Sequence, residues 1–173
     1  MKFVRISFAM VLAILAHNTV HAQDVSVQNA WARATVQGQK ATGAFMTLTS
    51  RLGHKLVSAS SPVAGVTEVH EMKMEGEVMK MRALEGGLDL PAGKAIELKP
   101  GGYHVMLMDL KLPVVKDSTV PLTLVFRNAK GQESKLDVKL PVGTAAPARP
   151  GVPEAGLGHG QGGKEMDHSH HKH

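Results

Sequence analysis

Turn-forming residues interrupt the chain at short, regular intervals between about Val25 and Val142, and this spacing limits what the chain can fold into. Clusters of Gly, Pro, Asp and Asn separate short apolar runs, and no long window keeps a helical period between caps. Residues 45–49 and 136–142 alternate apolar with polar side chains, as strands with one buried face do. Many short strands at this spacing are typical of antiparallel sandwiches and barrels. The sequence therefore predicts an all-β domain over residues 23–142.

The first 22 residues have the pattern of a signal peptide. Lys2 and Arg5 precede an apolar stretch at residues 6–16, and small residues lead up to Ala22. The apolar stretch is too short to cross a bilayer, so we expect cleavage after Ala22 and no stable membrane insertion afterwards. Because an exported bacterial chain without cysteine suits the periplasm, we expect a periplasmic protein, with secretion beyond the periplasm as the alternative.

Residues 143–173 differ in composition from the domain. They are rich in Gly and Pro and offer little apolar surface to bury, which predicts a disordered tail. Clustered imidazoles on a flexible chain favour Cu(II) or Zn(II), and the alternatives are a solvated polar tail or an expression tag. Because the histidines are interrupted, a tag is disfavoured, and we expect the tail to bind Cu(II). Its candidate ligands are His159, Met166, His168, His170, His171 and His173.

The chain contains no cysteine, which excludes disulfides, thiolate zinc sites, iron–sulfur clusters and cysteine nucleophiles. Ten His and ten Met remain as the soft and borderline metal ligands. The formal charge of +5 falls by two when Lys2 and Arg5 are removed, and no basic run is interleaved with aromatic residues. Nucleic acid is therefore not an expected partner.

His and Met recur two residues apart in three segments of the domain. In a strand such residues share one face, so each pair would project together. Thioether sulfur is soft and neutral imidazole adds no charge, a combination that favours Cu(I). A blue-copper centre needs a Cys ligand, and the absence of an HExxH motif disfavours zinc catalysis. The alternative is that the methionines only fill the core. The three pairs are His70 and Met72, Met79 and Met81, and His104 and Met106.

These segments resemble the periplasmic copper chaperones of the PCu(A)C, or PCuAC, family. The match lies in HEMKM at residues 70–74, VMKMR at 78–82 and LKPGGYHVMLM at 98–108. It extends upstream to residues 29–33 and downstream to residues 120–124, and so covers most of the domain.

The resemblance implies a cupredoxin-like Greek-key β-sandwich that binds Cu(I) through two His and two Met. Carried onto this sequence, the ligands are His70, Met81, His104 and Met106. The segment between Met81 and His104 is one residue longer than the family pattern, which leaves Met79 as the alternative to Met81.

The family is associated with copper delivery to the binuclear copper centre of cytochrome c oxidase, alongside Sco-type proteins. This resemblance implies a non-enzymatic carrier. We expect the tail to capture Cu(II) and pass it to the domain after reduction, and because the chain has no cysteine, the reductant would come from elsewhere. One alternative is a periplasmic protein that sequesters or takes up copper without a dedicated recipient. A second is an adhesion or assembly domain whose methionines are core residues. An oxidase built on an N-terminal His brace would need cleavage before His21, which signal peptidase sites disfavour.

Overall fold

The computed structural model describes residues 24–147, so the predicted signal peptide and the six tail ligands lie outside the described residues. In residues 24–147 no helix is long and apolar enough to span a membrane. The regular elements described are strands, as the turn spacing predicts. They are β1 (Val25–Arg33), β2 (Ala41–Ser50), β3 (His54–Ser60), β4 (Ala64–Glu75), β5 (Val78–Ala83), β6 (Leu88–Leu90), β7 (Ala95–Leu98), β8 (His104–Leu110), β9 (Thr119–Asn128) and β10 (Glu133–Gly143).

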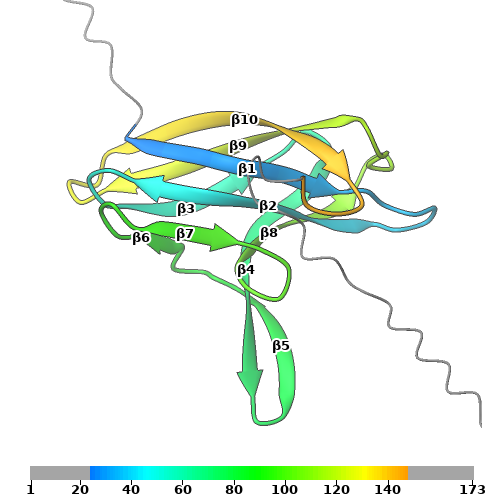
Figure 1. Ribbon diagram of the computed structural model, residues 1–173, viewed down its shortest axis with the longest axis horizontal. Helices are drawn as coiled ribbons and strands as arrows, with labels where there is room; N and C mark the ends of the chain where they lie inside the picture. Colours follow the sequence, from blue (N-terminus) through cyan, green and yellow to red (C-terminus); the bar gives the residue numbers. More distant parts are fainter. Residues whose placement is uncertain (1–23, 148–173) are drawn as a thin grey trace, which may run out of the picture.

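The strands follow the hydrogen-bonded order β5-β4-β8-β2-β1-β10-β9-β3-β6, and β7 pairs with the second half of β2. All neighbouring pairs are antiparallel except β1 and β10, which run parallel where Ala32 faces Val142. Figure 1 shows β10 alongside β1 at the top of the view and the β4–β5 hairpin at the opposite side. The strands form two layers that meet at β10, one made of β1, β2, β4, β5, β7 and β8 and the other of β3, β6 and β9. Two packed layers of antiparallel strands are a sandwich, which confirms the predicted fold class.

The main core lies between the two layers. β9 buries every second residue from Val120 to Phe126, and β8 contributes Val105 and Leu107 from the opposite layer. Each such fully buried aliphatic side chain stabilises the fold by about 2 kcal/mol. Because Val105 and Leu107 point inward, their neighbours His104 and Met106 occupy the outer face of β8, as the alternation predicts.

A β-bulge in β1 changes which face its side chains occupy. The pairing with β2 shifts by one residue between Gln28 and Trp31, and Asn29 takes a left-handed φ of 51°. Val25 lies in the core before the bulge, whereas Ala32 lies in the core after it. The extra residue therefore turns Trp31 onto the outer face, opposite Phe45 of β2.

The β4–β5 hairpin extends away from the sandwich. Figure 1 shows it projecting beyond the other strands, and every residue of β5 is exposed. Its base is held on β8, where His70 faces His104 and Val69 faces Val105. The hairpin thus carries its side chains past the edge of the core, next to the outer face of β8.

Candidate metal centre

Three strands bring the predicted His and Met residues to one region on the outer face. On β4, His70 lies opposite His104 of β8, and Met72 lies opposite Met81 of β5. Residues directly opposite in antiparallel strands share a face, so these four side chains project to the same side. Met106 follows two residues after His104 and joins them.

The two nitrogens of the His104 ring have different neighbours, a backbone carbonyl on one side and a methionine sulfur on the other. Its Nδ1 lies 3.0 Å from the carbonyl oxygen of Gly102, which can only accept, so Nδ1 carries the proton. In the neutral ring Nε2 is then a lone-pair donor, and it lies 3.2 Å from Sδ of Met81. Two electron-pair donors therefore point at each other with no proton between them. A cation that accepts nitrogen and sulfur would resolve this arrangement.

The loop from β7 to β8 provides the carbonyl that orients His104. Its Lys99-Pro-Gly-Gly102 sequence has Pro and Gly at the central positions that a type II turn prefers. Gly101 has a φ of 80°, and the Gly102 N–H donates to the Lys99 carbonyl at 3.0 Å. The Gly102 carbonyl also accepts a hydrogen bond from the Met72 backbone N–H at 3.2 Å. One carbonyl thus links the His104 ring to the β4–β5 hairpin.

His70 is held from its other nitrogen. Its Nε2 lies 2.9 Å from Oε2 of Glu68, and the residue is only 7% exposed. Its Nδ1 is buried and has no hydrogen-bond partner. When Nε2–H donates to the Glu68 carboxylate, Nδ1 keeps a lone pair that can bind a metal. Leaving this buried nitrogen without any partner costs free energy, and a bound metal would remove that cost. The centroids of the His70 and His104 rings are 5.9 Å apart.

The pKa of His104 lies below its usual value. Burial is the main cause, because it disfavours the charged ring, and a positive charge on His70 would lower the pKa further. The hydrogen bond to Gly102 opposes these effects without cancelling them. His104 is therefore neutral at pH 7 and keeps its Nε2 lone pair.

An open pocket gathers the sulfur atoms next to His104. It is lined by His104 together with the three thioethers of Met72, Met81 and Met106. His70 does not line this pocket but lies beside His104. Met81 is 49% exposed, so solvent reaches the group that faces His104.

The floor of the pocket is an aromatic stack that needs a glycine. A Cβ at Gly43, which lies opposite Met106, would come within 2.7 Å of the Phe45 ring. That ring lies 4.8 Å from Trp31 and 6.4 Å from His104, measured between centroids. The guanidinium of Arg33 covers it at 5.5 Å. The absence of a side chain at position 43 therefore leaves room for the Phe45 ring, which lines the pocket.

The structure also indicates how the two candidate methionines of β5 differ. Met79 pairs with Met74 nearer the tip of the hairpin and does not line the pocket, whereas Met81 contacts His104. Met72 also lines the pocket, although the resemblance did not place it among the four ligands. Its position two residues after His70 is the spacing that paired it with His70 in the sequence. Met46, by contrast, is a buried core residue.

The donor set is rich in sulfur. In the described part of the chain, no group of three or more His, Cys, Asp or Glu side chains is arranged to hold a metal. Zinc and hard cations prefer such groups, whereas thioethers with imidazole suit a soft monovalent ion. The residues present therefore fit Cu(I) better than Zn(II) or Mg(II).

Comparisons with known proteins identify relatives of this chain. The family model described as "Putative lipoprotein LpqE-like" matches residues 25–142. The "Putative lipoprotein Lxx21020" of Leifsonia xyli is 30% identical over 118 residues, which are 68% of this chain and 71% of that protein.

Solved structures similar to this chain include copper-binding domains. The solution structure of the Cu(I) form of DR1885 from Deinococcus radiodurans is 33% identical, with a TM-score of 0.55, and the match covers 71% of this chain and 80% of that one. A copper-bound PCuAC domain from PmoF2 shares the fold at 20% identity and a TM-score of 0.52, over 69% of this chain and 94% of that one. The predicted cupredoxin-like fold and the resemblance to PCuAC proteins are confirmed, and the chain belongs to the LpqE-like family.

Proposed function

We propose that this protein is a copper chaperone that carries Cu(I) as cargo and catalyses no reaction. His70, Met81, His104 and Met106 are its ligands in this proposal, and Met72 is a further thioether within the same pocket. The relatives support copper as the metal, because solved structures similar to this chain include a Cu(I) form and a copper-bound domain.

One observation carries the proposal: Nε2 of His104 faces Sδ of Met81 at 3.2 Å while Nδ1 donates to Gly102. This nitrogen and sulfur are aligned for a shared soft cation. The neutral imidazole and uncharged thioethers would leave the filled site with the single positive charge of Cu(I).

The exposure of the site supports a carrier rather than a store. Because Met81 is 49% exposed, a recipient's ligand can approach the ion and displace one thioether before the others leave. Transfer then proceeds by ligand exchange without change of oxidation state. The site lacks thiolate, whose stronger hold would oppose release.

The finer parts of the proposal concern location and partners. We infer export to the periplasm from the signal-peptide pattern of residues 1–22, and relatives named as lipoproteins support export. The proposed recipient is the binuclear copper centre of a cytochrome c oxidase subunit, with Sco-type proteins as further partners. In the tail, residues 159–173 would capture Cu(II) before an external reductant converts it to Cu(I).

The test is a Cu(I) titration of the mature chain against a competing chelator. The tail ligands are replaced by Ser in every sample, so only the domain is measured. The parent chain should take up one Cu(I) per molecule, and His104→Ala/Met81→Leu should lose tight uptake.

Met46→Leu is the matched control, since Met46 is buried in the core away from the pocket. It should bind as the parent does. Equal weak uptake by all three proteins would contradict the proposal. A loaded chain that releases copper to an apo-oxidase fragment is a chaperone, and one that retains it favours sequestration.

A further inference from the structure

A second pair of methionines lies on the hairpin beyond the pocket. Met74 of β4 and Met79 of β5 are directly opposite each other, one step of two residues past the Met72–Met81 pair. Their exposed fractions are 54% and 46%, and neither lines the pocket. Exposed thioethers at the end of a two-stranded ribbon add nothing to the core, so packing does not account for them.

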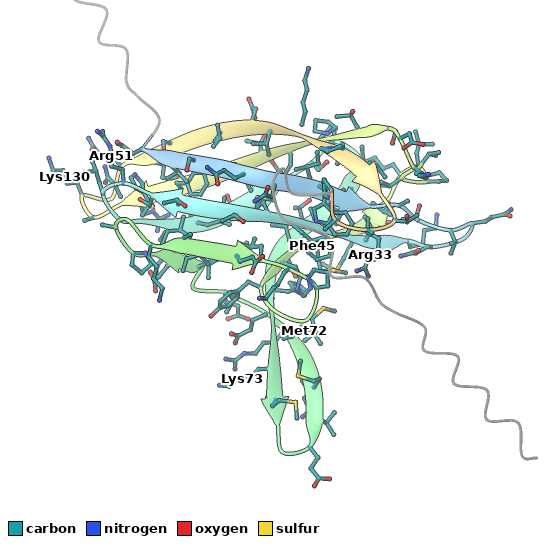
Figure 2. All side chains as sticks on the ribbon, in the orientation of Figure 1. Arg33, Phe45, Arg51, Met72, Lys73 and Lys130 are labelled. Carbon is teal, nitrogen blue, oxygen red and sulfur yellow. The ribbon has the colours of Figure 1, made fainter. Side chains whose placement is uncertain are left out.

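The two faces of the hairpin differ in chemistry. Met72, Met74, Met79 and Met81 share the face that leads to His70, because they are directly opposite or two residues apart. The intervening residues occupy the other face, which is charged. That face holds the ion pairs of Glu71 with Arg82 and of Glu75 with Lys80. Figure 2 shows sulfur atoms along the projecting hairpin below the labelled Met72.

The spacing of the four sulfurs suits stepwise movement of an ion. Directly opposite residues have Cβ atoms about 5 Å apart, so two flexible thioethers can reach a common ion. Successive pairs on one face are about 7 Å apart along the strand, a distance that these side chains can also bridge. Met81 lies at the end of this row and contacts His104.

We propose that Met74 and Met79 form a second, all-thioether site for a soft monovalent ion, Cu(I) or Ag(I), from which the ion passes through Met72 and Met81 to His104. The proposal rests on the proposed function of the pocket. Each step exchanges one thioether for another, and the ion keeps its charge and its electrons. Because the outer pair has no imidazole, it binds more weakly than the pocket, and the ion moves inward.

The first test uses the mature chain with Ser in place of the tail ligands. It measures the rate at which this chain takes up Cu(I) from a small-molecule donor. Met74→Leu/Met79→Leu should slow loading on the order of tenfold, because the chain loses local capture of the ion. Its final affinity should stay that of the parent. Met108→Leu, a half-buried outer-face methionine that does not line the pocket, is the matched control and should load normally.

The second test detects the outer site directly. In a His104→Ala/Met106→Leu background, Ag(I) should shift the ¹³C-methyl NMR signals of Met74 and Met79. Unchanged signals would overturn the site, and an unchanged loading rate in Met74→Leu/Met79→Leu would overturn its loading role. A parent chain that binds no Cu(I) at His104 but shows these shifts would overturn the proposed function and the inward transfer, while supporting the outer site.

Discussion

His70 and His104 lie directly opposite each other on neighbouring antiparallel strands, with their ring centroids 5.9 Å apart and their planes inclined by 57°. Both residues are buried, with exposed fractions of 7% and 6%. Each has one nitrogen engaged by a protein oxygen and one without such a partner. The fold therefore holds two imidazoles side by side, each with one nitrogen free of a protein oxygen.

Acid should destabilise the metal-free domain through His104. Its pKa is lowered in the fold from the ordinary 6.5, mainly by burial, so the unfolded chain binds the proton more readily. The contribution of His104 to the free energy of unfolding is therefore fully present above about pH 6.5, and it is lost as the pH drops toward the lowered pKa. Urea unfolding of the metal-free chain between pH 7.5 and about 5 measures this slope. His104→Asn should flatten it, and an unchanged slope in that variant would assign the effect to other groups.

Removing Glu68 should weaken Cu(I) binding although Glu68 is not a proposed ligand. Its carboxylate holds Nε2 of His70 at 2.9 Å, and the buried Nδ1, which has no hydrogen-bond partner, is then the ring's available donor atom. Loss of such an orienting partner typically costs about 10- to 100-fold in metal affinity, which we expect for Glu68→Ala. Glu68→Gln keeps an acceptor for His70, so its Cu(I) affinity should lie between those of the parent and Glu68→Ala. Glu71→Gln, on the charged face beside Arg82, is the control and should bind normally in the same chelator titration.

Gly43→Ala should disturb the pocket floor. The added Cβ would lie 2.7 Å from the Phe45 ring, which Trp31 and Arg33 hold in place. Overpacking of this kind costs about 1–3 kcal/mol, and displacement of the ring should also lower Cu(I) affinity. Gly86→Ala is the matched control, because a Cβ there meets no atom within 4 Å. If Gly43→Ala has the same stability to denaturant and the same Cu(I) affinity as the parent, the Phe45 ring is not held in place, which would contradict this account.

The bulge at Asn29 should tolerate Gly better than a branched residue. Asn29 has a φ of 51°, a conformation that costs most L-residues about 1–2 kcal/mol. Asn29→Val should lose roughly that amount in chemical denaturation, whereas Asn29→Gly should stay near the parent. Tryptophan fluorescence of Asn29→Val gives a second readout, because the bulge sets the position of Trp31. Equal stability of the two variants would contradict this account.

The sequence predicts much of the strand pattern because alternation is a local property. Residues Val105 and Leu107 point inward and His104 outward, as their order along one strand requires. The pairing of His70 with His104 depends on the register between strands, which local pattern does not determine. Glu68 was missed for a related reason, since a carboxylate two residues from a histidine contacts it only when both side chains leave the same face.

The Asn29 bulge and the exposed hairpin were also not predicted. The apolar alternation of β1 shifts by one residue at Asn29, but Trp31 lies between two apolar alanines. The local pattern therefore does not indicate that Trp31 turns onto Phe45. Met72 and Met46 have the same chemistry in the sequence, yet one lines the pocket and the other fills the core. Only the three-dimensional placement separates these two uses of methionine.

The group that orients the His104 ring belongs to the backbone, not to a side chain. The Gly102 carbonyl accepts from both the His104 ring and the Met72 N–H, and replacing Gly102 by Ala would keep that carbonyl. A Cβ there would meet Lys99 only at ordinary contact distances, beginning at 3.5 Å. An alanine scan would therefore not detect this acceptor. Side-chain substitutions alone would miss one of the groups that hold the imidazole in place.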